Sequence, residues 1–108
     1  MAVRKKHLFD WPQQELGAYG QALGHPARVQ ILEVLSMRGR CSFADLSERI
    51  PLATTTVAFH CQKLKSLGWM ELCSLDNGEA GYRLSKEAVQ DAVGAIQLFC
   101  MRLMLDAA

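Results

Sequence analysis

The most constraining feature of this sequence is a pair of short helices separated by a tight turn. The first helix is expected over residues 42–50, where Ser42 can cap its start and Pro51 ends it. The second is expected from Thr54 to Leu67, and Gly68 closes it. Two short helices joined by a tight turn are typical of a helix-turn-helix motif.

A β-hairpin is expected directly after this pair of helices. Residues 69–75 are β-like, Asp76-Asn77-Gly78 is a strong turn signal, and residues 81–84 can return as the partner strand. A helix pair followed by a hairpin is the order of a winged helix-turn-helix, in which the second helix of the pair enters the major groove of DNA. The predicted fold class is therefore mainly α with a small β-hairpin.

Three further helices complete the expected order. They cover residues 13–23, 26–38 and 86–105. Residues 1–12 carry several basic side chains and little pattern, so we expect a flexible basic arm there. The sequence shows no repeat, low-complexity tract or linker, which indicates one winged helix-turn-helix domain over residues 1–108.

Composition limits the class of protein but does not choose its partner. The 108 residues are 50% hydrophobic and 21% charged, as in a folded domain, and the chain is too short for a large multidomain enzyme. The formal net charge of +1 neither requires nor excludes nucleic acid, so the position of the charges has to decide.

The helix expected over residues 54–67 has the polar face of a DNA-reading helix. Its apolar side chains fall on the opposite side and would pack on the core: Val57, Cys61 and Leu64. The segment contains two lysines and no acid, so positive charge is concentrated there. Hydroxyl, amide and ammonium groups are suited to phosphates and base edges. The residues expected to contact DNA are Thr54, Thr55, Thr56, Ala58, Phe59, Gln62 and Lys63.

Parts of this helix have alternative interpretations. A solvated polar face on an ordinary helix would show the same pattern, and an exposed Phe59 is compatible with packing against a protein partner. In a DNA groove, the Phe59 ring could contact a thymine methyl group. His60 lies at the edge of the buried side, where we expect packing and hydrogen bonding rather than ligand binding or catalysis.

Three motifs resemble the ArsR/SmtB family of bacterial repressors. Residues 22–32 (ALGHPARVQIL) are similar to the family's opening motif A-L-(G/S)-H-P-x-R-(L/V)-x-I-L. Residues 55–64 (TTVAFHCQKL), with Leu67-Gly68 after them, resemble its recognition helix, and Tyr82-Arg83-Leu84 resembles the end of its wing. The resemblance covers residues 15–105 and implies a homodimeric winged helix-turn-helix repressor that leaves its operator when an effector binds.

Departures from the family pattern change the expected chemistry. The cysteine box of the metal-sensing members is absent before Asp45, and the last helix has no His/Asp cluster suited to zinc, so neither a metal site nor a cofactor is expected. Ala58 and Cys61 stand where the family usually has serine and leucine, which puts one polar DNA contact in doubt. The wing, residues 73–79, contains two acids and no basic residue, so its contacts with DNA should be weak.

The last helix, residues 86–105, is expected to form a homodimer interface. Between Ala95 and Leu105 only Gln97 and Arg102 are polar, and a helix that is apolar on nearly all sides needs cover on more than one side. A second copy of this helix, with the first helix alongside, is the simplest cover; a central helix buried within one subunit is the alternative. A twofold dimer would place two recognition helices about 34 Å apart and predicts an inverted-repeat operator in double-stranded DNA.

The four cysteines are the visible chemistry for an effector. They are widely spaced and form no C-x-x-C pair, which argues against a disulfide framework or a structural zinc site. Cys100 lies where several members of the resembled family carry a sensing cysteine, and Cys41 is the candidate for a second, with a thiol-reactive or arsenite-like effector. A small, buried and unreactive cysteine is the ordinary alternative.

Other classes of function are less well supported. A winged helix used for protein contacts, with weak DNA binding, is the main alternative. An enzyme is not expected and no catalytic residue is assigned, because the adjacent His60 and Cys61 project about 100° apart on a helix. The stretch from Ala95 to Leu105 is too short to span a bilayer, and no apolar run follows the basic start, so we expect a cytoplasmic protein without a membrane partner.

Overall fold

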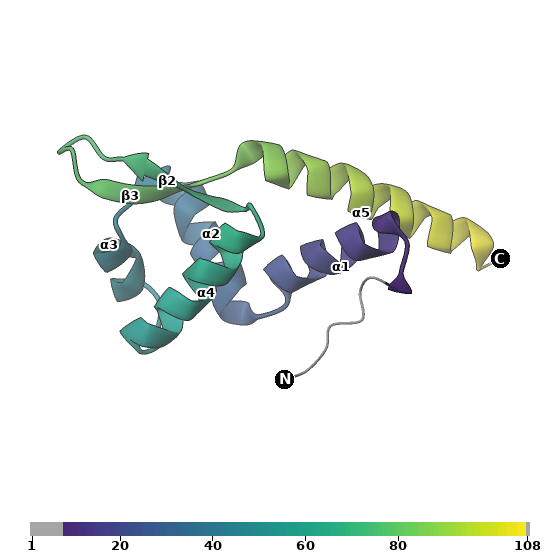
Figure 1. The fold of residues 1–108 in the computed structure, drawn as a ribbon, viewed down its shortest axis with the longest axis horizontal. Coiled ribbons are helices and arrows are strands. Elements are labelled where there is room, and N and C mark those ends of the chain that lie inside the picture. The colour runs from purple at the N-terminus through teal and green to yellow at the C-terminus, as the bar shows by residue number, and fades with distance from the viewer. Residues whose placement is uncertain (1–7, 108) are drawn as a thin grey trace.

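The computed structural model describes residues 8–107, which form five helices and a small antiparallel sheet (Figure 1). The wing and the long last helix project from opposite ends of a central group of helices. The elements in chain order are α1 (Trp11–Leu23), α2 (Pro26–Arg38), β1 (Arg40–Cys41), α3 (Phe43–Glu48), α4 (Thr54–Ser66), β2 (Met70–Ser74), β3 (Ala80–Leu84) and α5 (Lys86–Asp106).

The first helix begins earlier than the sequence pattern predicts. Asp10 and Gln13 form a reciprocal capping box, in which the Asp10 backbone N–H donates to Gln13 Oε1 at 2.9 Å. Pro12 fits the first turn, because its missing N–H would be unpaired there anyway. The expected flexible arm over residues 1–12 is therefore wrong for Trp11 and Pro12, and residues 1–7 lie outside the described part of the chain.

The helix pair forms as predicted, with the expected cap. The Ser42 hydroxyl accepts a hydrogen bond from the Asp45 backbone N–H at 3.1 Å and so starts α3. After the turn that contains Pro51, α4 runs through Ser66, and Gly68 takes the left-handed conformation (φ +84°) that ends it. The two helices lie across each other on the same side of α2 (Figure 1).

The core lies where α2, α3 and α4 meet the sheet. Its fully buried side chains come from α2, α3, α4 and strand β2 of the sheet. Burial of one large apolar side chain stabilises the folded chain by about 1.5–3 kcal/mol. The fully buried side chains are Ile31, Leu35, Leu46, Val57, Leu64 and Met70. This packing holds α4 by one face and leaves its other face to solvent.

The sheet has three strands, one more than the sequence predicts. Its order is β1-β3-β2, all antiparallel, with Arg40 opposite Arg83 and Glu71 on the other side of Arg83. The extra strand, β1, contains two residues and therefore has no periodicity that a sequence pattern can reveal. The β2–β3 turn contains Gly78 at φ +85°, as the Asp-Asn-Gly signal predicts.

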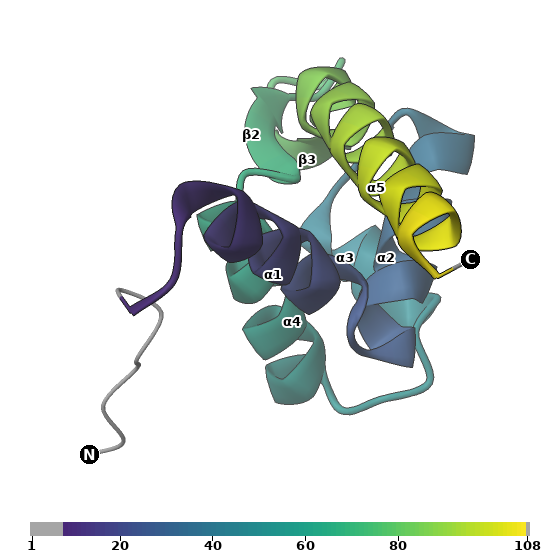
Figure 2. The same ribbon diagram turned by 90° about the vertical axis from the view of Figure 1, so that its right-hand side faces the viewer.

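The last helix, α5, is 21 residues long and runs beside α1, away from the sheet (Figure 2). Only Ala92 is buried along it, so the alternative of a central helix buried within one subunit is wrong. The helix is also longer than the apolar stretch used to exclude a membrane span. By length and composition alone α5 is apolar enough to cross a bilayer. A helix of a soluble protein whose apolar surface is covered by a second subunit meets the same criteria of length and composition as a membrane-spanning helix.

Candidate nucleic-acid interface

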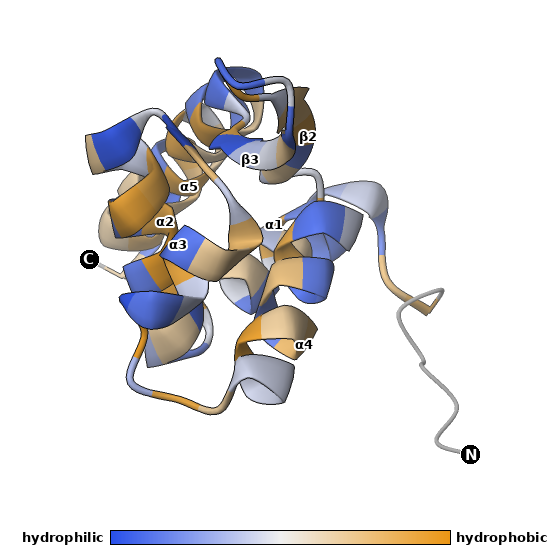
Figure 3. Ribbon diagram, turned by 90° about the vertical axis from the view of Figure 1, so that its left-hand side faces the viewer, coloured by the Kyte–Doolittle hydropathy of each residue, from blue (hydrophilic) through white to orange (hydrophobic). Residues whose placement is uncertain are grey.

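The polar face of α4 is exposed, while its apolar face is buried, as its sequence pattern predicts. Val57, Cys61 and Leu64 are each at most 4% exposed. None of the seven residues expected to contact DNA is buried. Of these, Lys63 is half-buried and the other six are exposed: Thr54, Thr55, Thr56, Ala58, Phe59 and Gln62. Figure 3 shows this helix beside α3 at one end of the molecule, with the wing on the same side.

Phe59 is the most unusual member of this surface. Its side chain is 65% exposed, and its ring meets the His60 ring edge-on with centroids 5.4 Å apart. A large aromatic side chain held on the outer face of a helix is available to a partner at little reorganisation cost. In the major groove it would supply apolar contact with thymine methyl groups.

The start of α4 adds hydrogen-bond donors to the same end of the helix. Ala53 occupies the cap position and has no side-chain acceptor, while its carbonyl accepts from the N–H groups of Thr56 and Val57. The N–H groups of Thr54 and Thr55 therefore have no helical or capping partner in the described structure. Free amides at a helix start attract phosphate oxygens.

A small groove continues the polar surface between α3, α4 and β3. It has a volume of about 230 Å³, and Gln62 and Lys65 of α4 line it together with Tyr82 of β3. The other lining residues are Phe43, Ala58 and Cys61. Lys65 was not among the seven residues expected to contact DNA, although it provides a second cation close to Gln62.

The tip of the wing is acidic, as its sequence predicts. Asp76 and Glu79 are both exposed, and the Glu79 N–H donates to Asn77 Oδ1 at 2.9 Å within the turn. Negative side chains near phosphates oppose binding, so the tip is poorly suited to contact the DNA backbone.

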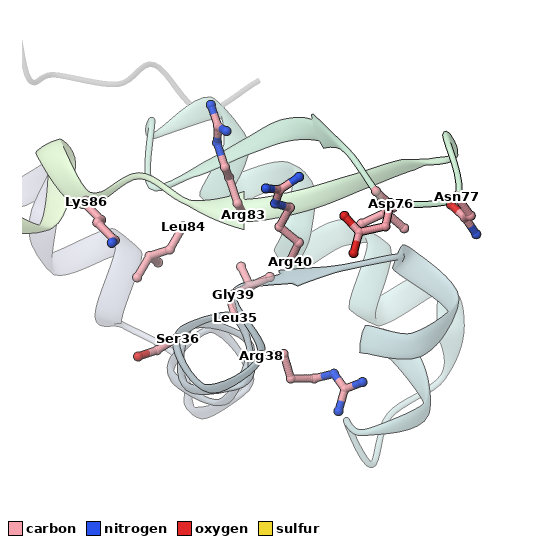
Figure 4. Close-up of a pocket in the computed structure, with 11 residues that line it drawn as sticks. Leu35, Ser36, Arg38, Gly39, Arg40, Asp76, Asn77, Arg83, Leu84 and Lys86 are labelled. Carbon is pink, nitrogen blue, oxygen red and sulfur yellow. The ribbon is translucent and has the colours of Figure 1, made fainter.

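Arginines lie at the base of the wing, and sequence analysis did not identify them. They line a groove of about 760 Å³ between the end of α2 and the sheet (Figure 4), where Arg40 and Arg83 extend from neighbouring strands to the same side. Arg40 Nη1 donates to the Ser74 carbonyl at 2.9 Å, and Arg83 Nε pairs with Glu71 at 2.8 Å. Because both have partners, these arginines first serve to connect the strands. No local sequence signal identifies them, since their position depends on the missed strand β1.

Comparison with known proteins supports the same interpretation. The family described as winged helix-turn-helix DNA-binding matches residues 26–69, which contain α2, α3 and α4. An ArsR family transcriptional regulator of known structure has 25% sequence identity and a TM-score of 0.69, over 88% of this chain and 94% of that one. The chain has an ArsR-type winged helix-turn-helix fold. The fold that the resemblance of residues 22–32 and 55–64 implies is thereby confirmed.

Other solved structures share this ArsR-type fold. An ArsR-like transcriptional regulator from Rhodococcus sp. RHA1 has a TM-score of 0.74 and 21% identity, over 88% of both chains. The transcriptional repressor BigR from Xylella fastidiosa has a TM-score of 0.61 and 21% identity, over 91% of this chain and 98% of that one. A search of curated protein sequences finds no match. The family and these structures are DNA-binding transcriptional regulators, not enzymes.

The candidate sensing thiols of this ArsR-type chain lie in different surroundings. Cys100 is exposed on α5. Cys41 is 2% exposed on β1, and its thiol donates to Asp45 Oδ2 at 3.4 Å. Burial, and then this bond to the carboxylate, raise the pKa of the Cys41 thiol above its ordinary value. Burial also raises the pKa of Cys61 to about 11.

The Cys41 thiol belongs to a polar cluster that fixes α3 against the end of α2. Asp45 pairs with Arg38 at 3.1 Å and with Arg49 at 3.5 Å. The thiol hydrogen bond from Cys41, and then the two arginines, lower the pKa of the Asp45 carboxyl. Among residues 8–107, no three His, Cys, Asp or Glu side chains come close enough to hold a metal ion. The arrangement is that of a structural cluster around a buried thiol.

Proposed function

We propose that this chain is a sequence-specific transcriptional repressor that binds double-stranded DNA, with α4 as its recognition helix. The observation that carries this proposal is the exposed outer face of α4, which combines hydroxyl, amide, aromatic and ammonium groups and contains no acid. These groups can contact both phosphates and base edges. With an acidic wing tip, most of the specificity would come from α4.

The proposed repressor is a homodimer that associates through α5, with α1 alongside. Leu98, Met101 and Leu105 are 62%, 54% and 74% exposed. At 100° per residue, all three project from the side of α5 opposite to the buried Ala92. A stripe of large apolar side chains facing solvent favours a second copy of the same helix, which would cover both stripes at once.

This dimer sets the form of the operator. Two recognition helices related by a twofold axis read half-sites about one helical turn apart, so the operator is an inverted repeat. A repressor of this kind works where its DNA is, so we place it in the cytoplasm. This proposal also explains the apolar surface of α5 without a membrane.

We further propose that a thiol-reactive or arsenite-like effector releases the DNA through Cys100, with Cys41 as the second thiol. The exposure of Cys100 on the proposed dimer helix supports its role. Modification there would change the packing of α5 against its copy. Cys41 is buried beside Asp45, so it would react only after α3 and β1 separate.

Fluorescence anisotropy of the full chain with its own upstream DNA tests the proposal. A scrambled duplex of the same composition is the control, and each titration is done at two salt concentrations, with and without reductant. We expect a specific Kd on the order of 10⁻⁸ M or tighter, with the scrambled duplex at least about a thousandfold weaker. Affinity should fall steeply with salt, because bound phosphates release counterions.

A protein-interaction module is the second candidate, and the exposed Phe59 together with the acidic wing tip favours it. It predicts feeble and equal binding to both duplexes at either salt concentration. That result would exclude the repressor proposal, whereas selective and salt-dependent binding would exclude the protein-interaction module.

A further inference from the structure

One arginine connects the first helix to the recognition helix. Arg28, in the first turn of α2, donates from Nε to the Gln21 carbonyl at the end of α1, at 2.8 Å. Its Nη1 lies 3.0 Å from Nδ1 of His60 in α4. A single guanidinium thus contacts α1 and α4 at the same time, and its planar set of five N–H donors allows both bonds in one fixed geometry.

The His60 end of this connection is buried and held by packing. His60 is 5% exposed, and it is the only polar or charged residue among residues 8–107 whose side chain is buried. Its ring lies 4.3 Å, centroid to centroid, from the ring of His25, the residue that caps α2. His25 in turn accepts from the Ala27 N–H through Nδ1 at 3.0 Å. The residue that caps α2 therefore lies against the His60 ring.

The polar contact specifies the protonation state of His60. A guanidinium only donates, so Nδ1 of His60 must be the acceptor and its proton must sit on Nε2. If His60 took up a second proton, Nδ1–H would face an Arg28 N–H, and two positive charges would lie 3.0 Å apart in a partly buried place. The contact can form only while His60 is neutral.

We propose that Arg28 and His60 act together as positioning residues, which fix α4 relative to α1, and that tight DNA binding requires this contact with His60 neutral. The inference rests on the proposed function in one respect, namely that α4 is the helix that reads DNA. Neither side chain needs to touch DNA. They act by holding the exposed face of α4 at one angle to α1, the helix that lies alongside the proposed dimer helix α5.

The surroundings of His60 support this assignment. The charged and titratable groups that act on its ring are His25, at the cap of α2, and Arg28, in the first turn of α2. The contact from α1 reaches His60 only through Arg28, whose Nε donates to the neutral Gln21 carbonyl. Burial, then His25, then Arg28 lower the pKa of His60 below its ordinary 6.5. These groups therefore favour the neutral ring, which is the form that the contact with Arg28 requires.

The test compares DNA affinity at pH 7.5 and pH 5.0, at constant ionic strength, for the full-length wild-type chain and for His60→Asn. The introduced asparagine side chain can present its oxygen where Nδ1 lies, so it accepts from Arg28 at both pH values. We expect the wild type to lose affinity at pH 5.0 relative to His60→Asn, because only the fraction with a neutral His60 is competent. Equal pH profiles for the two proteins would overturn the proposal.

Two further variants separate this contact from general effects of acid. His25→Asn keeps a good cap residue for α2 and removes the neighbouring imidazole, and it should keep the loss of affinity at low pH. Arg28→Met keeps an unbranched side chain but removes both hydrogen bonds. It should weaken binding about tenfold at pH 7.5 and abolish the pH dependence, provided that circular dichroism shows it folded. A folded Arg28→Met that keeps the wild-type pH profile would contradict the role of Arg28.

A measurement without DNA keeps this inference separate from the proposed function. The ring resonances of His60 in the free protein are followed by NMR from pH 8 to pH 4. We expect its pKa below 6.5 in the wild type and higher in Arg28→Met, since the adjacent positive charge is gone. Absence of DNA binding with this shift present would count against the repressor alone. An unchanged His60 pKa in Arg28→Met would count against the contact itself.

Discussion

Tyr19 of α1 packs edge-on against Trp69, where α4 ends and the wing begins, with ring centroids 6.4 Å apart and planes at 68°. Trp69 is 6% exposed, and its carbonyl accepts from the Ser85 N–H at 2.9 Å, just before α5. Tyr19 is itself held by its hydroxyl, which donates to Glu15 Oε1 at 2.6 Å. The aromatic pair therefore joins α1 to the junction of the recognition helix, the wing and α5.

Loss of the Tyr19 ring should destabilise the fold. We expect Tyr19→Ala to lower the free energy of unfolding by about 1–3 kcal/mol, from lost apolar burial and the lost aromatic contact. Tyr19→Phe keeps the ring and removes only the hydrogen bond to Glu15, so it should lose about 1 kcal/mol or less. Urea denaturation followed by tryptophan fluorescence measures both. Equal losses would show that the hydroxyl, and not the ring, holds this junction.

The Tyr19 hydroxyl should also titrate late. Its hydrogen bond to Glu15, then burial, then the charges of Glu15 and Asp91 raise the pKa of Tyr19 to about 12. The unfolded chain loses this proton near pH 10, so the stabilisation is present below pH 10 and is lost as the pH rises towards 12. Ultraviolet absorbance of Tyr82→Phe, which leaves one tyrosine, should show ionisation near pH 12. Ionisation near pH 10 in the folded protein would refute it.

The proposed dimer can be tested on the outer stripe of α5. Leu98→Glu together with Met101→Glu places two charges where a second copy would pack, and we expect a monomer by sedimentation equilibrium. Met37→Glu places the same charge on an exposed methionine of α2, outside α5, and it should stay dimeric. Both proteins should keep their helix content by circular dichroism. A double variant that sediments as the wild type would exclude this stripe as the interface.

The sequence predicts most elements of the fold because its signals there are local. Ser42 and Gly68 mark the ends of their helices, and the Asp-Asn-Gly turn defines the hairpin. The outer face of α4 also follows from local pattern, since one apolar face at helical spacing fixes which residues remain outside. This is why all seven residues expected to contact DNA lie on the exposed or half-buried side.

The features that the sequence could not predict depend on contacts between distant residues. Strand β1 exists because Cys41 is paired with Tyr82, far along the chain, and two residues carry no pattern of their own. The contact of Arg28 with His60 joins residues 32 positions apart. Sequence analysis recognised His60 as a residue that packs and forms hydrogen bonds, but the helical pattern cannot name its partner. The early start of α1 was missed because Asp10 and Pro12 were assigned to the arm.

Thiol reactivity should follow burial. With a limiting amount of iodoacetamide at pH 7.5, we expect Cys100 to be labelled first and Cys41 and Cys61 last, since burial raises the pKa of both buried thiols. Peptide mass spectrometry gives the order. If modification releases DNA, Cys100→Ser should bind DNA but lose the response to oxidant or arsenite. A response that persists in Cys100→Ser would remove Cys100 as the sensor.

Phe59 and Lys63 should contribute to DNA binding in different ways. Phe59 offers an exposed apolar ring, so Phe59→Ala should reduce the preference for thymine-containing half-sites by about 1 kcal/mol and leave the salt dependence unchanged. Lys63 offers charge, so Lys63→Gln should weaken binding to every duplex equally and reduce the slope of log K against log salt by about 1. Anisotropy titrations at four salt concentrations, with the upstream duplex and one in which uracil replaces thymine, measure both effects.

The two variants control for each other, because both alter the same face of α4 and neither alters its buried side. Uracil lacks the thymine methyl group, so the wild type should prefer the thymine duplex and Phe59→Ala should not. If Phe59→Ala instead lowers affinity equally for both duplexes, the ring packs against the protein or its partner and does not read the base. If Lys63→Gln changes the preference and not the slope, Lys63 contacts a base edge, and the half-buried position of this lysine would then serve to aim it into the groove.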